Sequence, residues 1–145
     1  MREIKFRGQT YDTPPHWVFG DLYHYTTGEP AINYPHPHKK WLESEPVRPA
    51  TVGQFTGLLD SDGKEIYEGD IVKCGTGRIC EVVYFLSPVH CGYDLNPVGG
   101  FDCKPPSEFT LWSDLKVIGN IHDSPELLEE DHLEYWGWGL GICRQ

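Results

Sequence analysis

The sequence predicts a mainly β protein with minor α content. Three observations support this prediction. The 145 residues include 16 Gly and 12 Pro, which implies many turns. Five Trp, eight Tyr and six Phe supply large side chains of the kind enriched in strands. Before the C-terminal region, apolar residues recur with the two-residue period of strands, without the sustained 3.6-residue period of a long helix.

The composition also limits the class of partner. The chain has 22 acidic and 12 basic residues, a formal net charge of −10 at pH 7. Contacts to phosphates need clustered Lys or Arg, so the overall charge opposes nucleic-acid binding. The N-terminus lacks the apolar segment of a signal peptide, and no apolar run reaches the length of a membrane span. We therefore expect a cytoplasmic protein without a membrane partner.

The first third of the chain predicts strands followed by a long loop. Residues 3–7 alternate polar and apolar, which places Ile4 and Phe6 toward the core of a strand. Residues 17–25 predict one or two further strands around a bend at Gly20 and Asp21. Residues 28–49 contain five prolines, so we expect a long surface loop there with at most one short strand.

The most regular pattern runs through residues 51–74. A strand is expected to end near Leu59 and to be followed by a turn over residues 60–63. In such a turn Asp side chains bond the backbone two residues on, and Gly63 supplies a positive φ. A second sharp turn is predicted at residues 68–70. The acids of this stretch lie at turns, so backbone hydrogen bonding explains them without a catalytic role.

The second half predicts further strands and one short helix. We expect a glycine hairpin at residues 74–78, a strand over 79–86, and a strand or strand pair over 108–121. Asp123 or Ser124 caps a helix that begins near Pro125. Residues beyond 134 are rich in Trp, Tyr and Gly, which is typical of a last strand covering the core or of an exposed patch for a partner.

No pattern of metal ligands is recognised, and we expect no cofactor. Five residues come into question for zinc: Cys74, Cys80, His90, Cys91 and Cys103. They include no Cys-x-x-Cys pair and match no structural-zinc spacing, so buried or reactive free thiols are the competing interpretation. His36 and His38 form a His-x-His pair, which is either a metal pair or two solvated side chains of a Pro-rich loop.

Catalytic patterns are incomplete as well. Ser87, His90 and Asp94 are close in sequence, but no Gly-x-Ser-x-Gly elbow surrounds the serine. Asp60 and Asp62 resemble the start of a calcium loop that lacks its downstream Glu. We therefore predict a protein that is not an enzyme.

Three segments together resemble the YopX family of phage and prophage proteins: MREIKFRG, VGQFTGLLDSDGKEIYEGDIV and LKVIGNIHDSPELL. The resemblance implies a mainly β fold whose C-terminal part is similar to an SH3-like β-barrel. It implies no settled activity and no catalytic residues. With it, we predict an N-terminal β region over residues 1–57, an SH3-like barrel part over 58–128 and an aromatic tail over 129–145, packed as a single compact unit.

Two functions from different classes follow. The first is a phage- or prophage-encoded accessory protein in the cytoplasm of the bacterial host, acting by self-assembly or on a host protein to modulate host physiology or defence. Its candidate interaction residues are aromatic: Tyr34, Trp41, Tyr135, Trp136 and Trp138.

The alternative function is a nucleic-acid-binding module that uses the SH3-like barrel and a basic patch. The first three basic residues of that patch alternate on the first strand and would share one face, and the other two lie in a loop. The patch consists of Arg2, Lys5, Arg7, Lys39 and Lys40. A solvated polar face is the competing interpretation, because a half-buried strand requires the same alternation.

Overall fold

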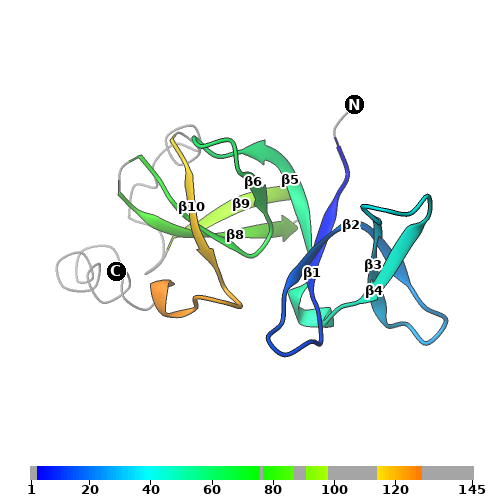
Figure 1. Cartoon of the computed structure of the whole chain (residues 1–145). Coiled ribbons are helices and arrows are strands. Elements are labelled where there is room, and N and C mark those ends of the chain that lie inside the picture. The colour runs from blue at the N-terminus through cyan, green and yellow to red at the C-terminus, as the bar shows by residue number, and fades with distance from the viewer. Residues whose placement is uncertain (1–2, 76, 87–90, 98–113, 129–145) are drawn as a thin grey trace. The chain divides into compact units, whose positions relative to one another are not determined.

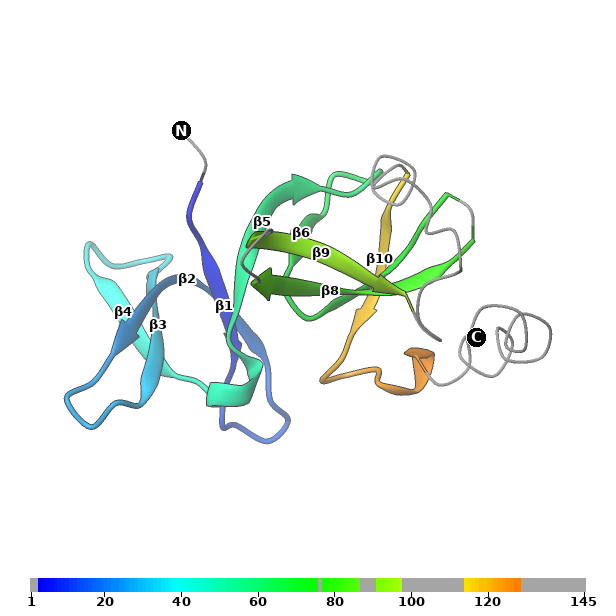
Figure 2. The same ribbon diagram turned by 180° about the vertical axis from the view of Figure 1, so that it is seen from behind.

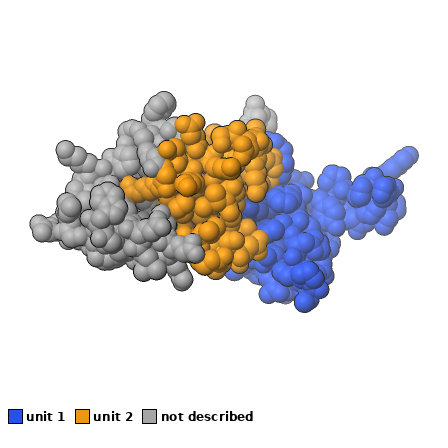
Figure 3. Space-filling model, turned by 60° about the vertical axis from the view of Figure 1, so that its left-hand side comes forward, with its two compact units in different colours: residues 1–57 blue, residues 58–145 orange. Residues whose placement is uncertain are grey.

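The computed structural model describes residues 3–75, 77–86, 91–97 and 114–128. These residues form ten strands in two antiparallel sheets, together with one short helix at residues 126–128, orange in Figure 1. The mainly β prediction is thus confirmed. None of the helices in these ranges has the length and apolar character that a membrane crossing requires. The chain divides into two compact units, Met1–Gly57 and Leu58–Gln145 (Figure 3).

The N-terminal unit is a curled antiparallel sheet in which the strands follow one another as β4-β3-β2-β1-β5. Its elements are β1 (Phe6–Gln9), β2 (Trp17–His24), β3 (Pro30–Pro35), β4 (Leu42–Pro46), the 3-10 turn η1 (Pro49–Thr51) and β5 (Gly53–Leu59), which continues past the unit boundary. Thr10 bridges Val47, and the Arg48 amide donates to the Gln9 carbonyl at 2.9 Å. The end of β1 therefore meets the chain just after β4.

The core of this unit lies on one face of the sheet. Val18, Ile32 and Val47 form a buried cluster. Four half-buried side chains pack against it: Phe6, Leu22, Tyr34 and Val52. The cluster also requires a glycine at position 8, because a Cβ there would lie 2.7 Å from side-chain carbons of Val47.

The predicted orientation of the first strand is confirmed for Phe6, which packs against the buried cluster, and wrong for Ile4. Ile4 is 59% exposed, whereas Arg7 is only 7% exposed. The strand begins later than predicted, at Phe6, which leaves Ile4 outside it. β1 lies between β2 and β5 (Figure 2). In this central position the Arg7 side chain packs against the Trp17 ring of β2.

The prediction of a long loop over residues 28–49 is wrong for β4, whereas the one short strand that it allowed corresponds to β3. β3 and β4 form a hairpin with five registered pairs, from Ala31 and Pro46 to Pro35 and Leu42. The prolines are compatible with strands because they occupy strand ends, and β4 is an edge strand that needs no donor on its outer side. β2 likewise runs without interruption through the predicted bend.

The C-terminal unit carries a four-stranded sheet of order β10-β7-β8-β9. The four strands are β7 (Asp70–Lys73), β8 (Ile79–Leu86), β9 (Cys91–Pro97) and β10 (Lys116–Asn120). The remaining strand, β6 (Glu65–Tyr67), pairs with β5 at the edge of the other, six-stranded sheet. The buried cluster of this unit consists of Ile66, Val72, Cys74, Cys80, Val82, Leu95 and Leu115. The described strands form no closed barrel, so the SH3-like barrel stays a prediction.

The predicted turn chemistry is confirmed. Oδ1 of Asp60 accepts hydrogen bonds from the amides of Asp62 and Lys64, at 2.9 and 2.8 Å. Gly63 has the expected positive φ, 82°. At the second turn, Oδ2 of Asp70 accepts the Tyr67 amide at 2.8 Å. These carboxylates are structural, as the sequence indicates.

Candidate functional site

The outer face of β2 carries exposed aromatic side chains. Alternate residues of a strand point to opposite sides, so Trp17, Phe19 and Tyr23 lie on the side away from the buried Val18. Phe19 is 45% exposed and Tyr23 is 47% exposed. An outward face of a sheet is ordinarily polar. A row of exposed rings at these positions therefore marks a candidate interface.

Residues of β4 extend this face. Leu42 is 58% exposed and lies two positions before Ser44, on the same side of β4. Tyr25 follows the end of β2, and its hydroxyl lies 3.3 Å from Oγ of Ser44. The Tyr25 ring also meets Tyr23 edge to face, with centroids 5.5 Å apart. These contacts join the two strands into one surface.

We call this surface the outer aromatic surface and define it as Phe19, Asp21, Tyr23, Tyr25 and Leu42. Asp21 is exposed between Phe19 and Tyr23 and pairs with Asn33 of β3. The surface thus combines apolar rings with one carboxylate and offers groups for binding. It brings together no nucleophile, base and orienting group of the kind that catalysis needs.

Two of the predicted basic residues, at the β1 end of the chain, lie against aromatic rings of the same unit. The guanidinium carbon of Arg7 is 4.6 Å from the centroid of the Trp17 ring. Nζ of Lys5 lies 5.8 Å from the centroid of the Phe55 ring and 3.4 Å from a carboxylate oxygen of Glu3. Both cations pack on aromatic rings. Because Arg7 is buried, it presents little positive charge to solvent.

Trp41 lies in the turn between β3 and β4 and is 60% exposed. Its Nε1 donates to Oε1 of Glu43 at 3.3 Å, and Lys39 donates to the same oxygen at 3.3 Å. Nζ of Lys39 is also 5.2 Å from the Trp41 ring centroid. The hydrogen bond from Lys39, with smaller contributions from its charge and from Trp41, lowers the pKa of Glu43.

The other predicted residues are separated from this group or lie outside the described ranges. Tyr34 pairs with Glu43 in the β3–β4 register but packs against the buried cluster of the N-terminal unit, so it faces the core. Lys40 is exposed in the same turn as Trp41. Four candidates are not among the described residues: Arg2, Tyr135, Trp136 and Trp138.

The interaction residues predicted from the sequence do not include Phe19, Tyr23 and Leu42. A signal for the first two was present, because the run WVFGDLYHY has large apolar residues at both odd and even positions. Such a strand has two apolar faces, and only one can face a small core. Leu42 carried no such signal, since β4 was predicted as loop.

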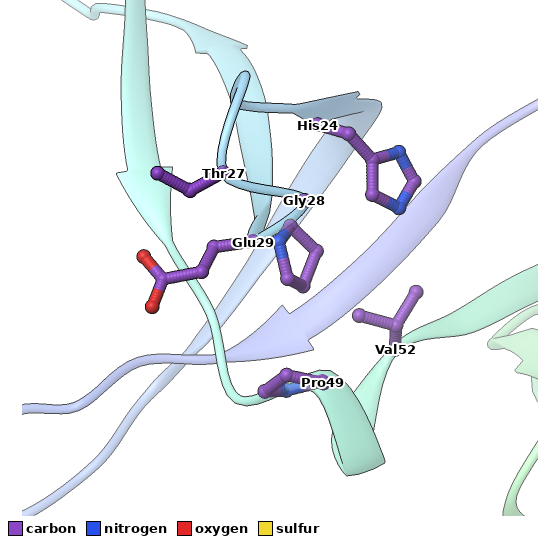
Figure 4. A pocket seen from close by; sticks show the side chains of 7 residues that line it. His24, Thr27, Gly28, Glu29, Pro49 and Val52 are labelled. Carbon is purple, nitrogen blue, oxygen red and sulfur yellow. The ribbon is translucent and has the colours of Figure 1, made fainter.

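A hollow with a volume of about 490 Å³ lies in the same unit. It lies between the β2–β3 turn and η1 and is lined by His24, Thr27, Gly28, Glu29, Pro30, Pro49 and Val52. In Figure 4 the His24 ring and the Glu29 carboxylate lie at opposite ends of the hollow. Its ionisable groups do not converge on a common point, so we assign no chemistry to it.

The described residues contain no group of three His, Cys, Asp or Glu side chains close enough to hold a metal ion. Within the predicted His36–His38 pair, Nδ1 of His36 accepts a hydrogen bond from the His38 amide at 3.0 Å. The two ring centroids are 6.1 Å apart. One ligating nitrogen of the pair is therefore already used by the backbone.

Comparison with known families gives one match. The family model described as YopX protein matches residues 5–129. No curated protein matches the chain. The match covers both sheets.

Proposed function

Because the chain belongs to the YopX family, we propose that it is a phage- or prophage-encoded accessory protein that acts by binding another protein and catalyses no reaction. The observation that carries this proposal is the outer aromatic surface, with Phe19 and Tyr23 each nearly half exposed. In a bacterial host its cytoplasmic partner would be a protein of host physiology or defence.

The chemistry of the surface favours a protein partner. Tyr and Phe rings bury large areas, and Tyr hydroxyls also hydrogen-bond, which is why such residues dominate protein interfaces. The exposed carboxylate of Asp21 would be complementary to a Lys or Arg on the partner. In a symmetric dimer formed through this surface, two Asp21 carboxylates would meet at one interface. The surface therefore fits a basic patch on another protein better than a second copy, and self-association is one outcome of the test.

Two finer parts of the proposal concern the rest of the chain. We propose that residues 58–128 form an SH3-like barrel, supported by the four-stranded antiparallel sheet and its own buried cluster. We also propose that Tyr135, Trp136 and Trp138 form a second contact region, supported by their density in a short segment. Deletion of residues 135–145 tests the second part. Unchanged partners and unchanged mass by light scattering would remove the tail from the interface.

Nucleic-acid binding is less well supported. Of the basic residues predicted for it, Arg7 is buried against Trp17, and Lys39 is paired with Glu43. The exposed Asp21 would repel phosphates from the neighbouring rings. A protein partner is consistent with all three observations.

The test is affinity capture from a bacterial host lysate with two variants. Phe19→Ala combined with Tyr23→Ala removes the two most exposed rings of the β2 face. Tyr11→Ala is the matched control, since Tyr11 is 54% exposed in the connection between β1 and β2. We expect recovery of the partner to fall about tenfold or more with the double variant, because central aromatic anchors contribute about 1–2 kcal/mol or more each.

The control variant is expected to recover the partner as the wild-type chain does. Light scattering of the same variants across a concentration series reports self-association. If the double variant recovers the same proteins in the same amounts and keeps the same mass, the outer aromatic surface is not the interface.

A further inference from the structure

Two cysteines of the C-terminal unit face each other across the β7–β8 hairpin. The sulfur atoms of Cys74 and Cys80 are 3.6 Å apart, and both residues are buried, at 4% and 0% exposure. The hairpin is closed by the Cys74 amide, which donates to the Arg78 carbonyl at 2.8 Å. Cys80 pairs with Val72, so the two cysteines occupy diagonal positions on the same face of adjacent strands.

The geometry brings the two thiols close to bonding distance. A disulfide bond is about 2.05 Å long, so the sulfurs need to approach by roughly 1.5 Å. Rotation of both side chains and a small shift of the hairpin tip can supply this movement. At Gly77, which has a positive φ of 88° and open space where a Cβ would lie, no side chain obstructs such a shift.

We propose that Cys74 and Cys80 are an oxidation site, a dithiol that a hydroperoxide converts into an intramolecular disulfide. The Cys74 thiolate attacks the O–O bond of hydrogen peroxide, which gives a sulfenic acid at Cys74 and releases hydroxide. The Cys80 sulfur then attacks the Cys74 sulfur, the S–S bond forms, and the sulfenic hydroxyl leaves as water. Two thiols lose two electrons and two protons, and the peroxide becomes two waters.

The surroundings favour Cys74 as the attacking residue. A hydrogen bond from the Cys80 thiol lowers the pKa of Cys74, burial opposes this, and the positive charge of Arg78 adds to the lowering. A lower pKa increases the fraction of reactive thiolate near neutral pH. Cys74 also follows the last residue of β7, precedes the exposed Gly75 and is the less buried of the two thiols, so it is the thiol nearer to dissolved peroxide.

The competing account is that both thiols only fill the core. They belong to the buried cluster of the C-terminal unit, and free cysteines often pack as small apolar residues. The two accounts differ in outcome. Inert packing predicts thiols that react only after unfolding and independently of each other, whereas the oxidation site predicts one linked pair in the folded chain.

Peptide mapping of the full wild-type chain tests the inference without any substitution. Trypsin cuts after Lys73 and Arg78 and does not cut between Lys104 and Pro105, so Cys74 falls on peptide 74–78 and Cys80 on peptide 79–116. After hydrogen peroxide treatment of the folded chain and blocking of the remaining thiols, we expect these two peptides to be linked. Fragmentation of the linked species should place the bond at Cys80, and dithiothreitol should separate the peptides.

A matched variant set sharpens the result. In a background with Cys91, Cys103 and Cys143 replaced by Ala, the chain should lose two thiols per molecule, both recovered with dithiothreitol. Adding Cys74→Ala or Cys80→Ala should prevent this paired loss and leave one thiol that oxidises to a sulfinic acid. The proposal is overturned if wild-type peptide 74–78 links to Cys91 or Cys103 instead, or if it links to Cys80 only after denaturation in urea.

Discussion

At the scale of single residues, Asp60 is the side chain that organises the C-terminal unit locally. One carboxylate oxygen accepts two amides of its own turn, and the other accepts the Val117 amide of β10 at 3.0 Å. Burial alone would raise the pKa of Asp60. The hydrogen bonds from Val117, Lys64 and Asp62, together with the charge of Lys64, outweigh burial and lower it.

We predict that Asp60→Asn lowers the free energy of unfolding by about 1–3 kcal/mol, because an amide nitrogen cannot accept the hydrogen bond that one of these oxygens accepts. Asp62→Asn is the matched control. Asp62 is exposed in the same turn, and the one contact described for its carboxylate is a 3.8 Å ion pair with Lys116. We therefore expect Asp62→Asn to change the free energy of unfolding by no more than about 0.5 kcal/mol. Urea unfolding at pH 7 measures both.

The lowered pKa of Asp60 also predicts how its contribution to stability depends on pH. The stabilisation is complete above the unfolded-state pKa of about 3.9 and is lost as pH falls through the lower folded-state pKa. The difference between wild type and Asp60→Asn should therefore shrink below pH 4. Glu68 and Glu81, whose pKa values burial raises, act in the opposite direction in both chains, so they cancel in the comparison. A difference that stays constant down to pH 2 would contradict this role.

The same residue shows what could be predicted from the sequence. The turn bonds of Asp60 span two to four residues and follow from its position before Gly63. The hydrogen bond to Val117 spans 57 residues, and the local sequence around Asp60 does not predict it. The burial of Arg7 has a similar cause. Alternation of charged and apolar residues cannot tell an edge strand from a central strand whose two faces are both covered.

At the scale of elements, strand existence was easier to predict than the use of proline. The segments leading to β2, β5, β7 and β8 are rich in β-branched and aromatic residues and were predicted as strands. For the β3–β4 hairpin the sequence predicts a loop with at most one short strand, because Pro usually interrupts strands. Pro30, Pro35 and Pro46 instead occupy strand ends, where proline is tolerated. That choice depends on sheet order, which is a tertiary property.

In the N-terminal unit, one buried hydroxyl connects the end of β1 to η1. Oγ1 of Thr51 accepts the Gln9 amide at 2.9 Å and donates to the Arg48 carbonyl at 2.6 Å. The registered pairs of β1 with β5 involve Phe6 and Arg7, so the Thr51 hydroxyl bonds the last residue of β1 where β5 does not pair with it. Thr51 itself is only 6% exposed.

We predict that Thr51→Val costs about 1–3 kcal/mol of unfolding free energy, because valine keeps the shape but leaves a buried amide unpaired. Hydrogen exchange resolved at Gln9 should accelerate, whereas exchange in the C-terminal sheet should follow only the global change in stability. Thr26→Val, in the exposed β2–β3 turn, serves as control and should leave Gln9 exchange unchanged. Equal protection of Gln9 in wild type and Thr51→Val would show that the hydroxyl is not needed there.

At the scale of the whole molecule, each unit has its own buried cluster and its own chemistry. The cluster of the N-terminal unit lies on one face of its sheet and leaves aromatic rings on the other. The cluster of the C-terminal unit encloses a dithiol. The sequence predicts an aromatic interface as the first of two functions. Of its described candidates, Trp41 is exposed and Tyr34 faces the core, and the exposed Phe19 and Tyr23 are not among them. Composition reveals the number of aromatic residues, whereas only strand parity and sheet order reveal which of them are exposed.

The charge of the whole chain yields the last prediction, which separates the two functional classes. A chain with a net charge of −10 repels the phosphate backbone, and binding requires a local cluster of free cations to overcome this. Arg7 is buried, Lys5 lies 3.4 Å from Glu3, and Lys39 lies 3.3 Å from Glu43. In a gel mobility assay we therefore expect no shift of a single-stranded or duplex oligonucleotide at low salt. This should hold even at protein concentrations on the order of 100 µM, where ordinary non-specific binders are at least half bound.

The control is the double variant Lys39→Glu with Lys40→Glu, which should behave as the wild-type chain does. A shift that weakens steeply with added salt, and that the double Lys variant abolishes, would instead establish the nucleic-acid-binding function, because only phosphate contacts through this turn would respond to both changes.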